Sequence, residues 1–291
     1  MPEVLVVGGS GLLGQHLLSE AKARGLDALG TYAGAPMEGQ TRVDLGDSSA
    51  TVKLVRDIAP RIVLLAAAMT RVDACEAHPD EARAVNGDAP GEIAKACASS
   101  RARLVFFSTD YVFDGGNGPY DEDAGTGPLN VYGRTKLEGE RHVLAALPGA
   151  LILRTSANFG WNRSRGKENS VTWILGKLRR GEEVPLFTDQ KVSPSYVPEV
   201  ARMTFDLLEA KASGVYHAAT RGCLTRHAMG EAICEVFRLS KDLLKPSRLA
   251  DAKLAAPRPR DACLSTGRLE RLLHITPSTF REALEHMRDS E

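Results

Sequence analysis

The stretch VLVVGGSGLLG at residues 4–14 decides the fold of this 291-residue chain. It begins with a short, mostly β-branched apolar run, and its glycines follow as Gly8-x-x-Gly11-x-x-Gly14. Leu12–Arg24 then carries apolar residues at helical spacing. A strand, a glycine turn and a helix in this order present backbone N–H groups and a helix N-terminus to a diphosphate. The stretch therefore predicts a dinucleotide-binding turn, with a purely structural turn as the alternative.

Alternating strand and helix patterns continue through the first half of the chain. The expected strands are Glu3–Val7, Ala28–Tyr32, a short strand ending near Val43–Leu45, Ile62–Ala67, Leu104–Ser108 and Leu151–Arg154. The expected helices are Leu12–Arg24, Ser49–Ala59, Asp80–Ala98 and Val131–Ala146. Repeated strand–helix–strand units imply a parallel sheet with right-handed crossovers. We therefore predict an α/β fold with a doubly wound Rossmann sheet, which binds ligands at the carboxyl ends of its strands.

The alternation changes after about residue 155, where we expect a smaller C-terminal α/β lobe that binds the substrate. Its elements are predicted at Ser170–Arg180, Val184–Phe187, Arg226–Phe237 and Leu264–Met287. Helix Val197–Ala210 and strand Val215–Ala218 are expected to return to the main sheet. The predicted division assigns 1–157 and about 188–218 to the nucleotide-binding domain, and about 158–187 and 219–291 to the lobe.

Composition excludes several classes of protein. The 37 basic and 37 acidic side chains give zero formal net charge, which argues against nucleic-acid binding through a broad basic field and against a polybasic membrane surface. No apolar run approaches the ~20 residues of a membrane span, and the start lacks signal-peptide features. The five scattered cysteines suit free thiols in a reducing cytosol. We therefore expect a cytoplasmic protein with neither nucleic acid nor membrane as its partner.

The end of the second strand bears on the choice of cofactor. An acidic residue there favours NAD by binding the ribose 2′-hydroxyl, and an arginine nearby accommodates the 2′-phosphate of NADP. Here the strand ends Gly30-Thr31-Tyr32-Ala33, with neither side chain. Thr31 is suited to bonding either form, so the choice between NADPH and NADH stays open.

A second motif, Tyr132-x-x-x-Lys136, lies on the helix expected at Val131–Ala146. Residues four apart share one face of a helix. A tyrosine with its ordinary pKa of about 10 is a poor acid–base group at neutral pH, and a nearby ammonium lowers that pKa. The pair predicts a proton donor to a carbonyl oxygen, with the lysine also holding the nicotinamide ribose. A solvated helix face is the alternative, since the spacing is common by chance.

A third element precedes that helix, where the strand Leu104–Ser108 runs into Thr109, Asp110 and Tyr111. A hydroxyl at this strand end lies at the same edge of the sheet as the glycine turn. There it can hydrogen-bond a substrate carbonyl and orient the tyrosine. A turn or helix cap is the alternative. The glycine turn, the strand-end hydroxyl and the tyrosine–lysine pair, in this order, favour a reductase site.

Longer stretches of the chain match a known family. They are GGSGLLG at 8–14, AAAMTRVDACE at 66–76, FSTDYVFDG at 107–115, PLNVYGRTKLEGE at 128–140, LRTS at 153–156, DQKVSPSYVPEVA at 189–201 and RPRDACLST at 258–266. Over essentially its whole length the chain resembles an extended short-chain dehydrogenase/reductase. More narrowly, it resembles the dTDP-4-dehydrorhamnose reductase family, which also contains the regulatory β subunit of methionine adenosyltransferase.

The resemblance implies a role for each matching position. Tyr132 is the expected proton donor, Lys136 its partner, and Thr109 the hydroxyl that polarises the substrate carbonyl, with Ser108 as a weaker candidate. The residues expected to bind the cofactor, Thr31 included, are Gly8, Gly11, Leu12, Leu13, Gly14, Thr31, Asp44, Leu45, Ala66, Ala67, Ala68, Tyr132 and Lys136. The residues expected to contact the substrate are Thr70, Tyr111 and Asn169.

Two features depart from the family pattern near the expected substrate pocket. Family reductases carry an aromatic residue, usually tryptophan, just after RTS, and this chain has Ala157. The basic loop at 163–167 is also outside the pattern, and its cations are suited either to gripping a diphosphate or to a solvated surface. Arg258 and Arg260 carry the same alternatives, together with a structural ion pair.

The leading hypothesis is NADPH- or NADH-dependent reduction of the 4-keto group of a nucleotide-linked deoxysugar. A cofactor-binding regulatory subunit without turnover, like the methionine adenosyltransferase β subunit, is the second hypothesis. A nucleotide-sugar epimerase of the same superfamily is the third. The seven scattered histidines lack metal-ligand spacing, so we expect no metal site. The expected partner is a small nucleotide sugar, and a homodimer stays an open alternative.

Overall fold

The computed structural model describes residues 1–34, 37–162 and 168–291. Within these ranges a sheet of seven parallel strands has the order β3-β2-β1-β4-β5-β6-β9. Its strands are β1 (Val4–Val7), β2 (Ala28–Tyr32), β3 (Gln40–Arg42), β4 (Ile62–Leu65), β5 (Arg103–Thr109), β6 (Leu151–Thr155) and β9 (Gly214–His217). The strand order reverses between β1 and β4, where doubly wound sheets bind their ligands. The predicted α/β Rossmann architecture is confirmed.

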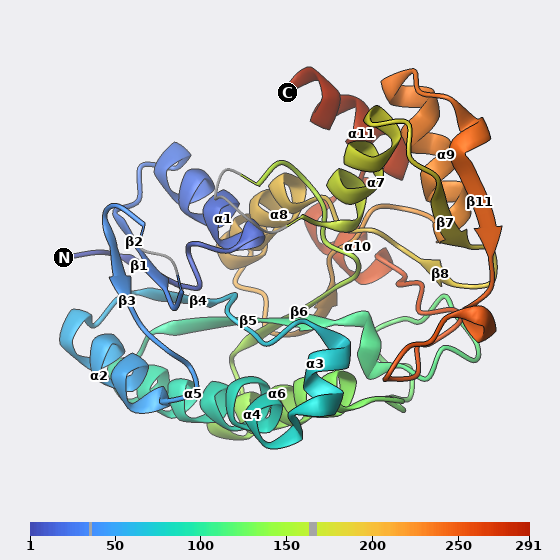
Figure 1. Cartoon of the computed structure of the whole chain (residues 1–291). Coiled ribbons are helices and arrows are strands. Elements are labelled where there is room, and N and C mark those ends of the chain that lie inside the picture. Colours follow the sequence, from blue (N-terminus) through green and yellow to red (C-terminus); the bar gives the residue numbers. More distant parts are fainter. Residues whose placement is uncertain (35–36, 163–167) are drawn as a thin grey trace.

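Helices cover both faces of the sheet (Figure 1). One face packs against α1 (Leu12–Ala23), α8 (Val197–Glu209) and α10 (Gly267–Leu273), and the other against α2 (Ser48–Ile58), α5 (Ala89–Ser100) and α6 (Val131–Ala146). Alternation along β1 sorts its side chains, because neighbouring residues of a strand point to opposite faces. Val4 and Val6 enter the first core, and Leu5 and Val7 enter the second.

A further apolar core lies beside the sheet and belongs to a smaller lobe (Figure 1). Its helices are α7 (Ser170–Arg179), α9 (Arg226–Phe237) and α11 (Phe280–Asp289). Two small sheets join them, the parallel pair β7 (Val184–Phe187) and β11 (Leu244–Ser247) and the antiparallel pair β8 (Lys191–Val192) and β10 (Leu224–Thr225). Leu269 of α10 packs under the main sheet, although 219–291 is assigned to the lobe by sequence. The domain division stays a prediction.

The segment expected to form one helix over Asp80–Ala98 is divided. It lies in α4 (Pro79–Arg83), a π-helical turn η1 (Ala84–Asp88) and α5, and a separate short helix, α3 (Val72–Ala77), precedes it. Pro79 starts α4, where its missing N–H costs nothing. In the π-turn, the Asn86 amide accepts from the Met69 N–H and donates to the Met69 carbonyl oxygen, both at 2.9 Å. The irregular turn therefore fixes the loop that follows β4.

The third strand ends at Arg42, one residue before the predicted end near Val43–Leu45, because Asp44 accepts the Gly46 N–H in a tight turn. The acidic run at 120–123 is partly buried, since Glu122 is buried and accepts the His217 N–H. The remaining short elements are the 3-10 turns η2 (Asp110–Val112), η3 (Lys241–Leu243) and η4 (Leu249–Asp251). Among the described residues, no helix is both long and apolar enough to cross a membrane.

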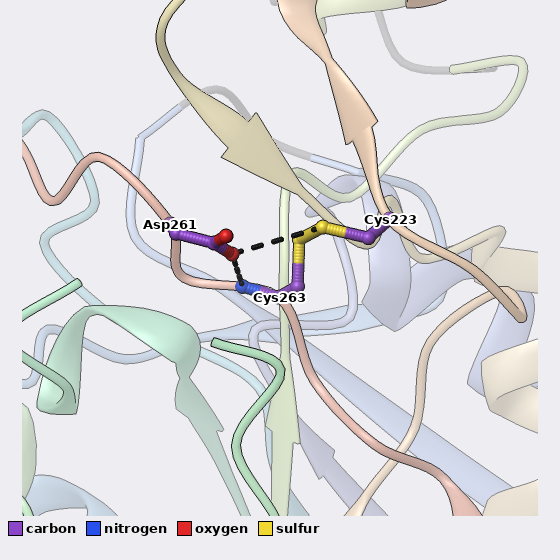
Figure 2. Close-up of side chains that lie close together, drawn as sticks. All are labelled: Cys223, Asp261 and Cys263. Carbon is purple, nitrogen blue, oxygen red and sulfur yellow. Dashed lines mark hydrogen bonds between the residues drawn. A yellow bond between two sulfur atoms is a disulfide. The ribbon is translucent and has the colours of Figure 1, made fainter. Parts of the chain in front are cut away.

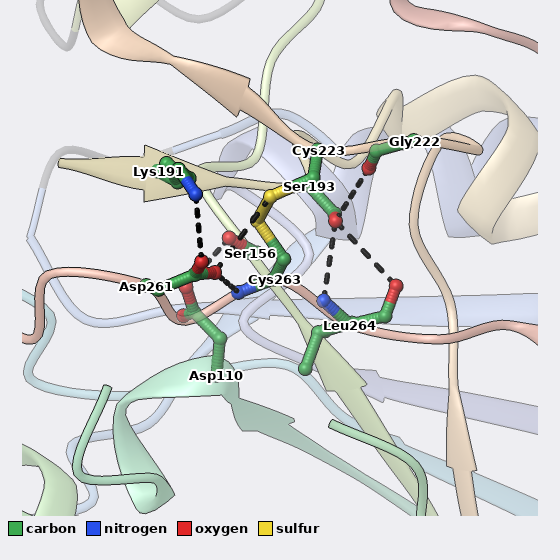
Figure 3. The surroundings of a disulfide bond; sticks show 9 residues. All are labelled: Asp110, Ser156, Lys191, Ser193, Gly222, Cys223, Asp261, Cys263 and Leu264. Carbon is green, nitrogen blue, oxygen red and sulfur yellow. Dashed lines mark hydrogen bonds and ion pairs between the residues drawn. A yellow bond between two sulfur atoms is a disulfide. The ribbon is translucent and has the colours of Figure 1, made fainter. Parts of the chain in front are cut away.

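Cys223 and Cys263 form a disulfide, so the prediction of free thiols is wrong for this pair (Figure 2). Their Cα atoms lie 5.6 Å apart across a sequence separation of 40 residues. Asp261 accepts the Cys263 N–H and pairs with Lys191 at 3.2 Å (Figure 3). Cys223, Asp261 and Cys263 are close enough to share a metal ion, but sulfurs joined to each other are not thiolate ligands. The cysteines at 75, 97 and 234 are buried and free.

Reducing this disulfide is expected to lower the free energy of unfolding by about 3 to 4 kcal/mol, the chain-entropy value for a loop of this length. Urea unfolding of the oxidised protein, with and without dithiothreitol, measures the difference. A Cys223→Ser/Cys263→Ser variant is the control, since its stability should not respond to the reductant. An oxidised wild type that is equally stable with and without the reductant would contradict this stabilising role.

Candidate active site

The glycine turn between β1 and α1 is shaped for close approach of backbone to ligand. Gly8 has a φ of +90°, and a Cβ there would lie 2.7 Å from the Ala67 nitrogen. A Cβ on Gly14 would lie 2.0 Å from the Gly8 carbonyl oxygen. Gly11 is the N-cap of α1 and makes no side-chain cap bond, so the first N–H groups of the helix have no side-chain acceptor. This is the geometry that binds a diphosphate.

Thr31 holds the glycine turn in place through a hydrogen bond. Its side chain is buried, and its Oγ1 accepts the Gly8 N–H at 3.0 Å. The structure thus gives Thr31 a role in holding the turn, and its expected contact with a ribose stays a prediction. Of the two leucines in the turn sequence, Leu13 packs into the core under α1 and Leu12 is partly exposed.

The other predicted cofactor residues lie along the same edge of the sheet. Ala66 and Ala67 follow β4 and both donate their N–H groups to the Val7 carbonyl oxygen, which places them against the glycine turn. Ala68 continues this partly exposed segment. Asp44 is exposed after β3, and Leu45 is buried beside it. The strand ends therefore bring these segments to one edge, while their contacts with a cofactor remain predictions.

The start of α6 carries Tyr132 to the end of β5. Asn130 caps the helix by accepting the Gly133 N–H at 2.9 Å. A Cβ on Gly133 would lie 2.1 Å from the Tyr111 carbonyl oxygen, so only glycine lets α6 approach this closely. The hydroxyls of Tyr132 and Thr109 consequently lie close enough to interact. Tyr132 and Tyr111 are partly exposed, with ring centroids 5.7 Å apart, so both are open to a ligand.

Desolvation of its hydroxyl by the surrounding protein raises the pKa of Tyr132 above its usual range, although the neighbouring Thr109 hydroxyl opposes the shift. The sequence-based expectation of a lowered pKa is therefore wrong in direction. A tyrosine with a raised pKa keeps its proton at neutral pH, which is the form that a donor needs when a carbonyl is reduced.

Lys136 lies one helical turn after Tyr132 and is buried. Its Nζ donates to the Phe107 carbonyl oxygen at 2.6 Å and lies 3.9 Å from the centroid of the Phe106 ring. Burial lowers the pKa of Lys136 to about 7, and the negative charge of Glu140 opposes that shift. The structure thus places the ammonium against β5, where its charge depends on its surroundings.

Asp110 is a buried carboxyl that sequence reasoning left without a role. It accepts from the Thr109 hydroxyl at 3.0 Å and from the Ser156 hydroxyl at 2.6 Å. Burial raises its pKa to about 6, and the two hydroxyls oppose the shift. Figure 3 shows Asp110 and Ser156 beside the disulfide. The hydroxyl of Thr109 is therefore fixed from both sides, by Tyr132 and by Asp110.

Gln190 and Arg226 border the site on the lobe side, and both escaped the sequence analysis. The Tyr111 hydroxyl lies near the Gln190 side chain, and Arg226 Nε donates to the Gln190 side-chain oxygen at 3.1 Å. The positive charge of Arg226 acts on both Asp110 and Tyr111. Arg226 has no ion-pair partner in the part of the chain that the structure describes. Gln190 lies in the stretch DQKVSPSYVPEVA at 189–201, which matches the family. That match is the sequence signal that could have identified Gln190 as a site residue.

The other residues predicted to contact the substrate are Asn169, Thr70 and the cations of the loop at 163–167. Asn169 caps α7, because its Oδ1 accepts two backbone N–H groups at 3.1 Å while its Nδ2 donates to the Gly160 carbonyl oxygen. Thr70 is exposed in the loop after β4. Arg163, Arg165 and Lys167, the predicted grip on a diphosphate, lie outside the described residues. Thr70 and Asn169 thus remain predictions as substrate contacts.

The position after the RTS stretch holds a small side chain with an unusual backbone. Ala157 has a φ of +42°. The aromatic residues that follow turn into the lobe, where Phe159 is fully buried and Trp161 donates to the Met287 carbonyl oxygen at 2.6 Å. Arg258 makes the structural ion pair foreseen as one alternative, donating to Asp73 at 2.8 Å.

Comparison with known proteins places the chain in a family. The model described as the RmlD substrate binding domain matches residues 2–291. The chain belongs to the RmlD family. Among its relatives, the probable low-salt glycan biosynthesis reductase Agl14 of Haloferax volcanii is 37% identical over 290 residues, covering 96% of this chain and 95% of that protein. Methionine adenosyltransferase 2 subunit beta of Danio rerio is 34% identical over 288 residues, covering 97% and 88%.

A solved structure agrees with this placement. The dTDP-4-dehydrorhamnose reductase of Bacillus anthracis, in complex with NADP, has a TM-score of 0.90 to this RmlD-family chain, with 27% sequence identity and full coverage of both chains. The predicted membership of the dTDP-4-dehydrorhamnose reductase family is confirmed, and relatives from both of its predicted branches match over most of the chain.

Proposed function

We propose that this RmlD-family protein uses NADPH or NADH to reduce the 4-keto group of a nucleotide-linked deoxysugar. The observation that carries the proposal is the cluster of Thr109, Tyr132 and Lys136 at the edge of the sheet, beside the glycine turn. The NADP complex of a structural neighbour supports a nicotinamide cofactor, and a relative named as a reductase supports a reduction. The bound cofactor would supply a hydride to the carbonyl carbon.

The residues of the glycine turn fit that cofactor. A Cβ at Gly8 or Gly14 would collide with neighbouring backbone, and the N-terminus of α1 faces the turn without a side-chain cap. Gly8, Gly11 and Gly14 would therefore hold the diphosphate. Ala66–Ala68 would line the ribose side, and Lys136 would hold the nicotinamide ribose.

The protein's own part in the reaction is to orient the carbonyl and to supply a proton. Tyr132 would hydrogen-bond the carbonyl oxygen, and Thr109 would do so once its single proton turns from Asp110 to the substrate, which polarises the carbonyl. Tyr132 would transfer its proton to that oxygen, since its raised pKa keeps it protonated until charge develops there. Positioning by both lobes would supply a large part of the rate, since oriented groups react as if highly concentrated.

The test is a binding and turnover screen. Purified protein is incubated with NADPH or NADH and a panel of nucleotide 4-ketosugars, and oxidation of the cofactor is followed by absorbance at the nicotinamide band. Thermal shift with each ligand runs in parallel, since a ligand at 100 times its Kd stabilises by about 2.7 kcal/mol. Turnover of one ketosugar would support the proposal. The proposal would be contradicted if the protein bound the cofactor but neither bound nor turned over any nucleotide sugar.

Arg226→Gln is expected to raise KM for the nucleotide sugar by about 10- to 100-fold while changing KM for the cofactor little. A guanidinium without an ion-pair partner, beside Tyr111, is suited to an anionic part of the substrate, and hydrogen bonds to charged groups contribute about 1.5–3 kcal/mol. Arg238→Gln, at the exposed C-terminal end of the same helix, is the matched control. Equal KM values for both variants would show that Arg226 does not bind the substrate.

A second candidate function is a cofactor-binding regulatory subunit without turnover. The match to methionine adenosyltransferase 2 subunit beta over 97% of the chain favours it. Because a regulatory subunit can retain the reductase residues, the site's geometry does not separate the two functions. Co-purification of a synthetase from source lysate, together with no reduction of any ketosugar, would support the regulatory function. Turnover with a ketosugar would favour the reductase.

A further inference from the structure

A buried ion pair lies directly behind the candidate active site. Glu140 of α6 and Arg154 of β6 are 3% and 4% exposed. Arg154 donates from Nε and Nη2 to the two carboxylate oxygens at 2.9 and 2.7 Å. The Ser108 hydroxyl donates to the same carboxylate at 2.5 Å. Burying a charged pair is costly, and replacing such a pair with apolar residues is often neutral for stability, so its presence here calls for a role beyond packing.

Glu140 shares one face of α6 with the proposed catalytic residues. Tyr132, Lys136 and Glu140 follow at intervals of four, so they lie one above another. Each faces one of three consecutive residues at the end of β5. Lys136 bonds the Phe107 carbonyl oxygen and Glu140 bonds the Ser108 hydroxyl, and the Tyr132 hydroxyl lies beside that of Thr109. The helix therefore holds the strand end by two hydrogen bonds directly beside the Tyr132 hydroxyl.

One charged side chain among the described neighbours of Lys136 can compensate the positive charge of its ammonium. From β5, the Phe107 carbonyl oxygen and the Phe106 ring face its ammonium. On α6 the neighbours are Tyr132 and Glu140, and Arg154 of β6 is reached through the Glu140 carboxylate. Among the described residues, Glu140 is the charged group that acts on Lys136. Without it, the ammonium would be buried against a carbonyl and a ring alone.

We propose that Glu140 is a positioning residue of this active site, which holds the end of β5 on α6 and supplies the counter-charge that keeps Lys136 an ammonium. The inference rests on the proposed reductase function for its effect on rate. Its effect on the charge of Lys136 stands independently. The YxxxK pair is thereby extended by one helical turn, to Tyr132-x-x-x-Lys136-x-x-x-Glu140.

Glu140→Gln is expected to move the high-pH decline of kcat to lower pH. An opposite charge within about 4–6 Å shifts a pKa by about 1–3 units, and residues four apart on a helix, as Lys136 and Glu140 are, lie about this far apart. Because burial already places the pKa of Lys136 near 7, a loss of one unit would lower the protonated fraction at pH 7 about 5-fold, and two units about 50-fold. The deficit should shrink as the pH falls. Glu138→Gln is the matched control, because Glu138 lies on the same helix and pairs with Arg83 at the surface.

The double variant Glu140→Gln/Arg154→Gln separates a charge effect from damage to the fold. It removes both members of the buried pair, so no unpaired charge is left behind. A stable double variant that keeps the shifted pH profile would support the proposal. A double variant with the wild-type profile would overturn it, as would an unshifted profile in Glu140→Gln.

An NMR titration of the Lys136 side chain, assigned with Lys136→Arg, gives a readout that needs no turnover. The expected result is a lower pKa of Lys136 in Glu140→Gln than in wild type or Glu138→Gln. Equal pKa values would overturn the proposed role of Glu140. If the wild type reduced no ketosugar, the proposed function would fail, and the titration would still decide the charge of Lys136.

Discussion

Tyr132→Phe is expected to lower kcat for ketosugar reduction by about 10²- to 10⁴-fold, the usual contribution of a positioned proton donor. The substitution removes one oxygen from the first turn of α6 and leaves the ring in place beside Tyr111. Cofactor binding at the glycine turn should persist, because that turn is built from the backbone between β1 and α1. Stopped-flow measurement of a single turnover, with saturating NADPH, isolates the chemical step.

Tyr120→Phe is the matched control for this experiment. Its hydroxyl donates to Asp114 at 2.5 Å, and its ring stacks on Phe113 at 4.2 Å, away from Thr109. Its kcat should stay within about 2-fold of the wild type, since the lost hydrogen bonds, to the Asp114 carboxylate and from the Asn117 N–H, lie outside the site and do not touch the reacting atoms. Full activity of Tyr132→Phe would remove Tyr132 from the mechanism. An equal loss in both variants would point to the fold rather than to proton transfer.

Local sequence signals predicted the parts of the site that are made by single elements. Helix α6 begins and ends where predicted, because Asn130 is a strong N-cap and the apolar residues keep helical spacing over Val131–Ala146. The glycine turn is equally local. A Cβ on Gly11 or Gly14 would crowd backbone atoms only a few residues away, and Gly8 alone of the three is crowded by a distant residue, Ala67. Both elements were therefore visible before the fold was known.

Pairs between distant segments were not predictable in the same way. Glu140 meets Arg154, Tyr111 meets Gln190, and the two bridged cysteines are separated by 40 residues. Each of these side chains is compatible with many partners until the topology brings one of them near. In the folded chain, some residues also form hydrogen bonds with nearby backbone that a sequence motif does not predict.

Thr31 and Asn169 show this second limit most clearly. Both are expected to contact ligands, and those contacts stay predictions. In the structure Thr31 accepts the Gly8 N–H from a buried position, and Asn169 uses its amide to cap α7 and to bond Gly160. Small polar side chains commonly satisfy nearby backbone groups in this way. A motif therefore fixes where such a residue lies, and the hydrogen bonds around it decide what it can still bind.

Arg154→Met is expected to lower the free energy of unfolding by about 3 to 5 kcal/mol, the usual cost of removing one member of a buried ion pair. The Glu140 carboxylate would then be left with the Ser108 hydroxyl as its side-chain partner at the end of β5. The lost guanidinium also lies 5.1 Å from the Phe113 ring, so a cation–π contact is lost as well. Urea unfolding at equilibrium measures the change.

The double variant Glu140→Leu/Arg154→Met tests the cause of that loss. If the cost comes from an unpaired buried charge, removing Glu140 as well should restore most of the stability, because apolar replacements of buried pairs are often neutral. Arg61→Met is the control, since Arg61 pairs with Glu3 at the surface, where an ion pair contributes about 0 to 1 kcal/mol. Additive losses in the double variant would show that packing around Arg154, and not its charge, holds this end of the sheet together.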